Sequence, residues 1–443
     1  MTNNELFQNE KISKLLLRLA PPVMIAQLIQ ALYNIVDSYF IGKFSTDGLA
    51  ALSVIFPIQL LISALAVGTG VGVNTIMSKY DGLERRKNAN EAAGTGFLLA
   101  ILNWVVFALI TCLLMKAYTE ISLKSAAAQQ YAYEYGMIIC ACGFGIFAES
   151  NQSKILQARG DMKTPMIAQI AGAATNIILD YLLIFGIGIF PKLGIKGAAV
   201  ATVCGQILAA IIVEIKVFYK PPQLKKAKKY SAEIYKAGLP NILMNALCTV
   251  YIIVFNLILV RFSDDAVTVL GLYYKLQTFY LIPVLGLTTC IVPILSYNYA
   301  AKNTTRCRDI LRQSVIISVI CMGIGTLLFE LLPTQLLEIF AKGETQILQI
   351  GAIALRIIAI SFMPLAISLI MPTYFQAIGM NKQSIFITVL RQIFLLIPLA
   401  ALFSLLGLNC VWLAFPITEI ITAGVAIILY FKYPLQNNKI KQR

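Results

Sequence analysis

Long apolar segments separated by short charged stretches recur along all 443 residues of the sequence. A segment of about 20 apolar residues is long enough to cross a hydrocarbon layer of roughly 30 Å as a helix. Of the residues, 58% are hydrophobic and 13% are charged, whereas an average soluble protein has roughly 25% charged residues. The segments are continuously apolar, while strands of a membrane β-barrel alternate over about 10 residues. We therefore predict an all-α polytopic membrane protein.

Charged residues, prolines and glycines set the boundaries of the apolar segments. These boundaries predict twelve transmembrane helices. The predicted spans are 21–43, 52–80, 91–115, 127–156, 164–187, 196–218, 238–261, 267–299, 309–332, 345–375, 384–406 and 409–431.

The distribution of Lys and Arg predicts the orientation of these helices, because cytoplasmic loops carry an excess of both. With both termini in the cytoplasm, 26 of the 36 Lys and Arg residues lie inside, seven lie outside and three lie within spans. We therefore expect cytoplasmic termini, and we do not interpret the net charge of +15 as a sign of nucleic-acid binding. Residues 1–19 lack the apolar region of a cleavable signal peptide, so we expect the first helix to be retained.

The two halves of the sequence resemble each other at an offset of 219 residues. Pro21, Tyr80 and Gln157-Ala-x-Gly160-x-x-Lys163 recur as Pro240, Tyr299 and Gln376-Ala-x-Gly379-x-x-Lys382. Six helices separate equivalent points, so both copies enter the membrane from the same side. The repeat is then parallel, with a pseudo-twofold axis along the membrane normal.

This repeat divides the chain into two six-helix lobes. We predict an N-lobe at 1–218, a cytoplasmic basic linker at 219–237 and a C-lobe at 238–443 that ends in a short basic tail. Two lobes that rock about a central cavity would provide alternating access to the two sides of the membrane.

Acidic and amide side chains occur inside the predicted spans of the N-lobe. Asn176 and Asp180 are four residues apart, so they project from one face of the fifth helix. An ionisable side chain at membrane depth costs roughly 2.5 to 3.5 kcal/mol on insertion scales, which points to a functional use. In the first helix, Gln30, Tyr33, Asn34 and Asp37 form a polar stripe, and Thr202 of the sixth helix is a further candidate.

If these groups converge, they form a cluster of hard oxygen ligands. We predict that Asp37, Asn176, Asp180, Thr202 and Asn34 couple transport to an ion. Two carboxylates with an amide and a hydroxyl oxygen suit Na⁺, or a pair of carboxyl groups that shares a proton. The alternative is that both aspartates make structural hydrogen bonds or lie at the water interface. The sequence contains no histidine, and we expect no other metal site and no cofactor.

The C-lobe does not repeat this acidic arrangement, because Asp37 becomes Asn256 and Asp180 becomes Leu399 at the same offset. Its polar residues within or near spans are Lys275, Arg356, Arg391 and Glu419. We predict that Arg391 or Arg356 forms a buried ion pair with Glu419 that orders the lobe.

Several aromatic and flexible side chains could line a substrate cavity that stacks on flat cations. An aromatic or Met residue on such helices is more often part of the core. The candidates are Gln30, Tyr33, Phe56, Tyr273, Tyr274, Phe279, Tyr280 and Met363.

Three stretches together carry a family resemblance: Tyr33-Asn34-Ile-Val-Asp37-Ser-Tyr-Phe-Ile-Gly42, Gln157-Ala-Arg-Gly160-Asp and Asn176-Ile-Ile-Leu-Asp180-Tyr-Leu-Leu-Ile-Phe-Gly186. With them, essentially the whole chain resembles the multidrug and toxic compound extrusion (MATE) family, and most closely its DinF-like branch, which includes the MepA-type bacterial exporters. It departs from the NorM pattern because residues 238–260 and 355–375 contain no carboxylate.

The resemblance implies an exporter of cationic, amphipathic compounds, including antibiotics, by antiport with H⁺ or Na⁺. In that branch, the polar cluster of the N-lobe matches Asp37, Asn176, Asp180 and Thr202. We expect a protein of the bacterial cytoplasmic membrane that contacts lipids, acts as a monomer and is not an enzyme.

Two other functions compete with this one. A lipid-linked precursor flippase of the same superfamily would line its cavity with cationic residues, whereas the N-lobe charges here are acidic. An intramembrane aspartyl protease could use Asp37 and Asp180 as a dyad, but the Gly-x-Gly-Asp element of such enzymes is absent before Asp180.

Overall fold

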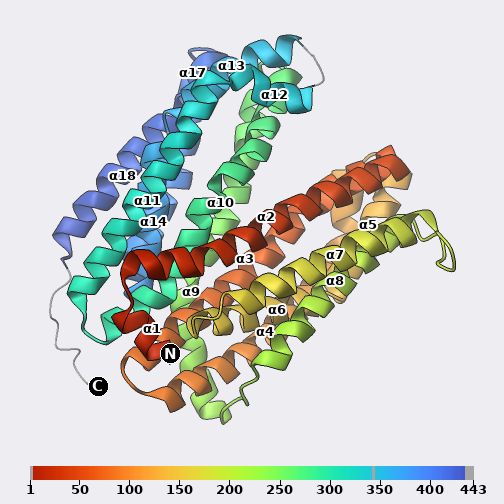
Figure 1. Cartoon of the computed structure of the whole chain (residues 1–443). Helices are drawn as coiled ribbons and strands as arrows, with labels where there is room; N and C mark the ends of the chain where they lie inside the picture. Colours follow the sequence, from red (N-terminus) through yellow and green to blue (C-terminus); the bar gives the residue numbers. More distant parts are fainter. Residues whose placement is uncertain (1–2, 342–344, 435–443) are drawn as a thin grey trace. The chain divides into compact units, whose positions relative to one another are not determined.

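The computed structural model describes residues 3–341 and 345–434, and within those ranges all regular structure is helical (Figure 1). In chain order the helices are α1 (Asn3–Asn9), α2 (Ile12–Phe44), α3 (Thr46–Gly82), α4 (Arg86–Ser122), α5 (Ala126–Ala141), α6 (Phe144–Ala158), α7 (Lys163–Phe185), α8 (Ile195–Lys216), α9 (Leu224–Leu259), α10 (Asp264–Ala300), α11 (Thr304–Leu331), α12 (Pro333–Ala341), α13 (Thr345–Ala359), α14 (Phe362–Ala377), α15 (Asn381–Val389), the π-helical segment η1 (Leu390–Leu396), α16 (Ile397–Ser404), α17 (Leu408–Val411) and α18 (Ala414–Lys432).

The lengths and compositions of these helices agree with twelve membrane spans. Ten of the helices or continuous helical segments in the described ranges are long and apolar enough to cross a membrane alone. Two bent helix pairs, α5 with α6 at 44° and α13 with α14 at 53°, bring the number to twelve if each pair crosses the membrane once. The sequence predicted each pair as one unbroken helix, and that detail is wrong. Gly143 lies at the first break, and Ser361 and Pro364 lie at the second, where a missing proline N–H and local hydrogen bonds favour a kink.

Other predicted boundaries also differ from the structure. Helix α9 begins at Leu224, so most of the basic segment 219–237 forms the first turns of a helix that continues into the seventh span. The eleventh span contains η1 just before Pro398. Proline has no N–H, and its ring clashes with the carbonyl four residues earlier, so a locally widened turn relieves the conflict.

The internal repeat is visible in the helix ends. Both α3 and α10 contain 37 residues and begin after a serine cap. Ser45 Oγ accepts from the Gly48 N–H at 3.2 Å, and Ser263 Oγ accepts from the Ala266 N–H at 3.1 Å. A cap of this kind satisfies an amide at the helix start that has no partner within the helix.

The doubled Gln-Ala-x-Gly motif also ends two helices in the same way. Gly160 and Gly379 have φ angles of 78° and 82°, in the left-handed region that glycine adopts without steric cost. The N–H groups of Gly160 and Gly379 each donate to the glutamine carbonyl three residues earlier at 3.0 Å. The two loops are therefore structurally equivalent.

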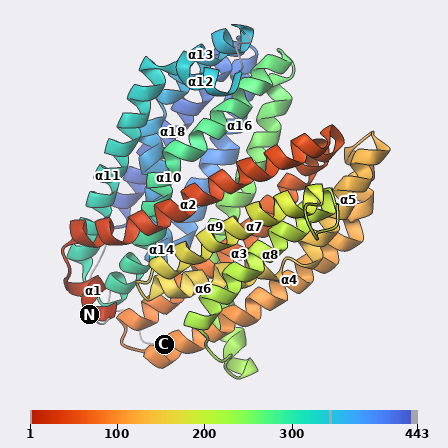
Figure 2. The ribbon, with the colours of Figure 1, turned by 45° about the vertical axis from the view of Figure 1, so that its right-hand side comes forward.

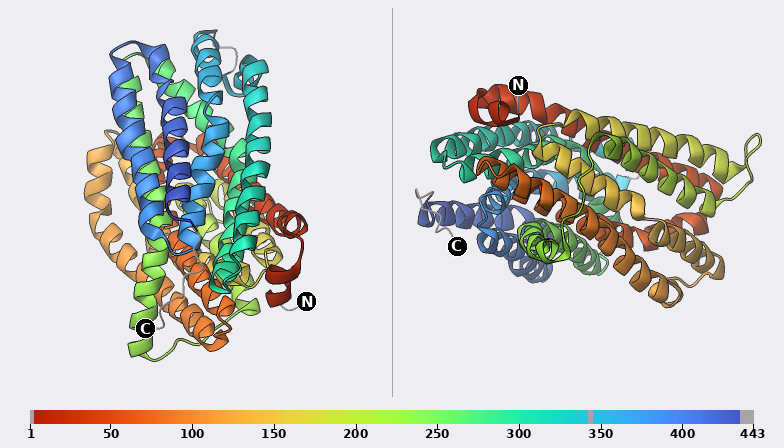
Figure 3. Two further views of the ribbon diagram at one scale, coloured as in Figure 1. Left: turned by 90° about the vertical axis from the view of Figure 1, so that its left-hand side faces the viewer. Right: turned by 90° about the horizontal axis from the view of Figure 1, so that it is seen from below.

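The chain divides into two compact units. The first, called here the N-unit, comprises Pro21–Ile242, and the second, the C-unit, comprises Met1–Ala20 together with Leu243–Arg443. In the N-unit, α7 and α8 lie side by side in both views, and α6 packs on α3 and α8 (Figures 1 and 2). In the C-unit, α14 packs against α11 and α18, and the teal-to-blue helices lie next to one another (Figure 3).

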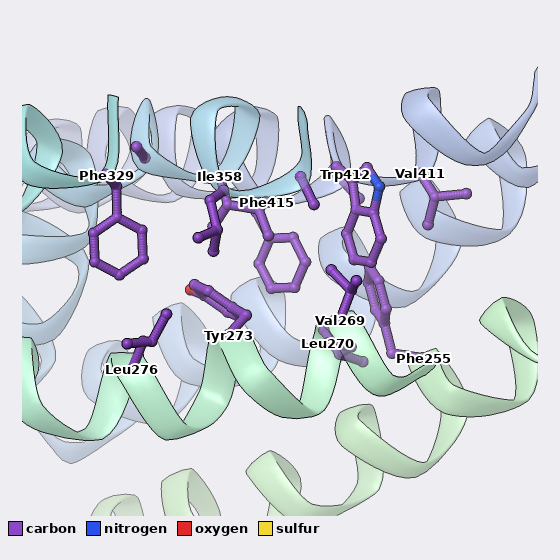
Figure 4. Packing of buried hydrophobic residues seen from close by; sticks show 14 of the residues in the cluster. Phe255, Val269, Leu270, Tyr273, Leu276, Phe329, Ile358, Val411, Trp412 and Phe415 are labelled. Carbon is purple, nitrogen blue, oxygen red and sulfur yellow. The ribbon is translucent and has the colours of Figure 1, made fainter. Parts of the chain in front are cut away.

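The C-unit contains a large aromatic core. Phe255, Tyr273, Phe415 and Trp412 belong to one buried cluster (Figure 4). The ring centroids of Phe255 and Phe415 are 4.9 Å apart, and those of Tyr273 and Phe415 are 5.6 Å apart. Such contacts hold α9, α10 and α18 together.

Candidate functional site

Helices α7 and α8 form the platform of the predicted site. Helix α7 starts after Asp161, whose Oδ1 accepts from the N–H groups of Lys163 and Thr164 at 3.0 Å each. A Cβ atom placed on Gly205 of α8 would lie 2.5 Å from the carbonyl oxygen of Gly172 on α7. Two glycines therefore allow the helix backbones to approach closely at this point.

This close approach brings together two of the predicted site residues. The Asn176 side-chain amide donates to Thr202 Oγ1 at 3.2 Å, and both residues are buried. Asn176 Oδ1 receives no hydrogen bond from any described residue. A buried carbonyl oxygen is thus left facing the interior of the N-unit with its lone pairs available.

Asp180 lies one turn further along α7 and contacts Asp37 of α2. Asp180 is 0% exposed and Asp37 is 7% exposed. Their carboxyl groups are close enough to share a hydrogen bond. However, within the described ranges neither oxygen of Asp180, nor Oδ1 of Asp37, receives a hydrogen bond from an N–H or O–H group.

This contact has a direct chemical consequence. Two ionised carboxylates at such a short separation repel each other, and burial weakens the screening that water would provide. A hydrogen bond between them requires a proton on one of the two. Either a shared proton or a small cation between the two carboxyl groups would remove this repulsion.

Two further polar side chains extend the cluster, and neither was predicted. The hydroxyl group of the buried Tyr135 on α5 accepts from Gln59 Nε2 on α3 at 3.1 Å and also hydrogen-bonds to the Thr202 hydroxyl. Gln59 and Tyr135 both lie within predicted spans, and a polar group inside an apolar span was the signal that could have identified them. The cluster thus runs from α3 through α5 and α8 to α7.

A third buried carboxylate was also missed. Glu149 of α6 is 6% exposed. Its Oε1 accepts from Ser153 Oγ at 2.6 Å and from Gln169 Nε2 at 3.0 Å. Glu149 lies within the predicted span 127–156, so the cost of burying a carboxylate, which drew attention to Asp180, applied to it equally.

Only part of the polar stripe of α2 is buried with the cluster. Asp37 is buried and Tyr33 is half-buried, but the side chains of Gln30 and Asn34 are exposed. Tyr33 interacts electrostatically with Asp37, Glu149 and Asp180. The stripe is wide enough that only one edge of it faces α6 and α7, and this leaves Asn34 outside the buried group.

In the C-unit, the predicted ion pair with Glu419 is formed by Arg391 and not by Arg356. Arg391 Nε donates to Glu419 Oε1 at 2.7 Å, and both side chains are largely buried. Arg356 and Lys275 are exposed. Arg391 lies in η1, so the widened turn carries the arginine that meets α18.

The proposed cavity residues have mixed surroundings. Tyr273 belongs to the aromatic core and is 1% exposed, so its packing there does not fit the expected role at an open cavity. Tyr280 stacks on Phe362 with a centroid distance of 4.2 Å. Tyr274 and Phe279 are half-buried, and Phe56 and Met363 are exposed.

Comparison with known families gives two matches to one family model. The model, described as MatE, matches residues 22–182 and residues 240–402. The same model fits each half once, as expected for the internal repeat.

Curated proteins of similar sequence span almost the whole chain. One is described as a FAD transporter of Shewanella oneidensis, which is 26% identical over 94% of this chain and 93% of its own length. Another is described as the multidrug export protein MepA of Staphylococcus haemolyticus, which is 24% identical over 97% of this chain and 95% of its own length.

Solved structures share the fold. The chain matches a MATE protein in complex with MaL6 at a TM-score of 0.91, with 22% identity over 98% of each chain. It matches an outward-facing multidrug resistance MATE family transporter of the MOP superfamily at 0.90, also with 22% identity and 98% coverage.

Proposed function

Because this chain belongs to the MatE family of multidrug transporters, we propose that it is a secondary active exporter that exchanges cationic, amphipathic compounds for incoming H⁺ or Na⁺. The family assignment from sequence motifs is thereby confirmed, and the chain is a multi-pass membrane protein. The coupling ion, the class of substrate and the bacterial cytoplasmic membrane as its location are parts of the proposal.

The contact between Asp37 and Asp180 is the observation that carries this proposal. The pair lies on two different helices of one unit, and three of its four carboxyl oxygens receive no hydrogen bond from the described residues. Binding a proton or Na⁺ removes the repulsion between the two carboxylates, and loss of the ion restores it. The energy of the contact between α2 and α7 therefore depends on ion occupancy, which is what coupling to a conformational change requires.

The neighbouring oxygens support the same role. Asn176 Oδ1 has unused lone pairs on a residue one helical turn from Asp180, and Thr202 orients the Asn176 amide. Hard oxygen ligands of this kind suit Na⁺, while a carboxyl pair alone suffices for H⁺. Asn34 is exposed, so we assign it a smaller part in ion binding than the sequence predicted.

Export of an anionic dinucleotide is a second candidate, because the Shewanella relative is described as a FAD transporter. A phosphate-bearing substrate, or the lipid-linked pyrophosphate of a flippase, needs cationic partners. Arg391 is paired with Glu419, and the buried charged cluster around Asp180 is acidic. These observations favour a cationic substrate.

Transport by purified protein in proteoliposomes tests the proposal. A fluorescent cationic dye is loaded, and a pH gradient and a Na⁺ gradient are imposed in separate experiments. We expect one of the two gradients to accelerate dye export severalfold over liposomes without protein. If neither gradient drives dye movement, or if FAD is driven and the dye is not, cation antiport is the wrong function.

A further inference from the structure

Glu149 differs from the aspartate pair in its hydrogen bonding. Three donors surround its carboxylate: Ser153, Gln169 and Ser150. Donors that face a carboxylate stabilise its charged form, whereas neither oxygen of Asp180, nor Oδ1 of Asp37, has a donor among the described residues. The N-unit thus contains one pair of carboxyl groups that can hydrogen-bond to each other only with a proton on one of them. It also contains one separate carboxylate whose charged form, which accepts protons, is stabilised by donors.

The two sites lie at different depths. Glu149 is nine residues from the end of α6 at Ala158, which is about 14 Å at 1.5 Å per residue. Asp180 is 17 residues from the start of α7 at Lys163, or about 25 Å. The same short loop joins these two helix ends, and the Lys and Arg distribution predicts that it is cytoplasmic. Glu149 is therefore nearer to the cytoplasm by roughly 11 Å.

Tyr33 lies at a depth between the two sites. It precedes Asp37 by one helical turn on α2, about 6 Å toward the same end of the unit. Its hydroxyl interacts electrostatically with Asp37, Asp180 and Glu149. A hydroxyl group both donates and accepts, so it can pass a proton between groups on either side.

A second step leads from Glu149 toward the helix ends. Gln152, one turn further along α6, donates to Glu214 Oε2 on α8. Glu214 is two residues from the end of α8 at Lys216 and is half-buried. Gln152 Oε1 receives no hydrogen bond from the described residues, which leaves a polar position for water beside this path.

The aspartate pair, Glu149 and Glu214 form a series of acidic groups at successive depths, called here the ladder. From it we propose that Glu149 is a second proton site, through which the proton taken up by the aspartate pair leaves toward the cytoplasm. The proton passes by way of Tyr33 to the Glu149 carboxylate, and then to water near Glu214. This inference rests on the proposed antiport and assigns H⁺ as the coupling ion. Gln169 presents an N–H to Glu149, and an N–H cannot ligate Na⁺.

The other groups that face Glu149 do not replace it in this role. Lys154, on its own helix, interacts with Glu149 electrostatically and donates to Gln157 Oε1 at 2.9 Å. Tyr33 faces it from α2 and Gln169 from α7. Glu149 lies at a depth between the aspartate pair and Glu214.

Comparison of driven transport with exchange tests the inference. In an antiporter, exchange of internal for external dye needs no proton release, whereas transport driven by a pH gradient does. We expect Glu149→Gln in the full-length protein to slow pH-driven dye export at least tenfold while exchange stays within about twofold of wild type. Glu149→Asp, which keeps a carboxyl group, should recover part of the driven rate.

Two further variants complete the experiment. Glu134→Gln removes a carboxylate that pairs with Lys196 at 3.1 Å, away from the ladder, and should change neither activity. Tyr33→Phe removes one oxygen atom and should slow pH-driven export, by less than Glu149→Gln does, while exchange is retained. This second variant keeps the inference testable if Glu149→Gln does not fold.

The outcomes separate the two proposals. If wild-type protein shows no driven transport, antiport itself fails. If wild type is driven by Na⁺ alone, or if Glu149→Gln loses or keeps both activities together, Glu149 is not a proton site. A split in Glu149→Gln, or in Tyr33→Phe where the first variant does not fold, supports it.

Discussion

The buried charged side chains of this protein differ in the hydrogen-bond partners that surround them. Asp180 and Glu149 are both buried carboxylates in one unit, but only Glu149 is surrounded by described donors. In the C-unit, Arg391 and Glu419 neutralise each other. We therefore propose a different role for each of these three buried acidic environments: ion coupling, proton transfer and structure.

Replacing Asp180 by Asn tests the coupling site. An amide of nearly the same size can donate to Asp37, so the contact becomes satisfied without an ion. We expect gradient-driven dye export to fall by more than about tenfold in a protein that still inserts and folds. Asp264→Asn, at the exposed start of α10, is the matched control and should retain wild-type export. Undiminished export by Asp180→Asn would contradict the coupling role.

Replacing Arg391 by Met tests the structural ion pair. The change leaves the buried Glu419 carboxylate without its partner, which typically costs about 3–5 kcal/mol. We expect a clear drop in the thermal unfolding midpoint of the purified protein in detergent. The double variant Arg391→Met, Glu419→Gln should recover much of that loss. Equal midpoints for wild type and the single variant would show that the pair contributes no stability.

The helices are placed by close backbone contacts as much as by apolar side chains. Gly172 and Gly205 allow α7 to approach α8, and this approach sets the hydrogen bond between Asn176 and Thr202. Small residues serve this purpose in membranes, because lipid offers no hydrophobic force to press helices together. The geometry of the proposed ion site therefore depends on the packing of α7 against α8, although α8 carries neither carboxyl group.

Gly205→Ala is expected to disturb this packing. The added Cβ atom would meet the Gly172 carbonyl oxygen at 2.5 Å and the Asn176 Cβ at 3.3 Å, so the helices must separate. Overpacking of this kind costs about 1–3 kcal/mol and should lower both the unfolding midpoint and export. Gly42→Ala on α2, where the nearest atom is 3.8 Å away, is the control and should behave like wild type. Equal effects of the two substitutions would refute the close-contact argument.

Across the complete chain, the repeat and the charge distribution predict how the protein sits in the membrane. The family model matches once in each half, and the described residues contain ten helices or continuous helical segments long and apolar enough to span a membrane, or twelve spans if each of the two bent pairs crosses once. We retain the proposal that residues 219–237 form a cytoplasmic basic connection between two lobes. Its helical part from Leu224 onward is continuous with the seventh span.

Reporter fusions test this orientation. Green fluorescent protein joined to the C-terminus should fluoresce, and alkaline phosphatase at the same position should be inactive, because both termini are predicted to be cytoplasmic. Phosphatase inserted between α7 and α8, at residues 187–194, should be active. The reverse pattern would overturn the orientation and also the direction of the proton path through Glu149.

The number of spans and the internal repeat follow from properties that are local along the chain, namely the length of each apolar segment and the recurrence of a motif. The orientation is a prediction from a property of the same kind, the side on which Lys and Arg fall. Asn176 and Asp180 were predictable as neighbours for the same reason, since a helix alone places residues four apart on one face.

Contacts between helices were not predictable in this way. The stripe on α2 includes Gln30, Asn34 and Asp37, but only the rotation of α2 against α7 buries Asp37 and leaves the other two exposed. Tyr135 reaches Thr202 because α5 packs on α8, and the depth of Glu149 relative to Asp180 depends on the loop that joins α6 to α7. Such contacts join residues far apart in sequence, and helix rotation and tilt, which packing alone sets, determine which polar side chains meet.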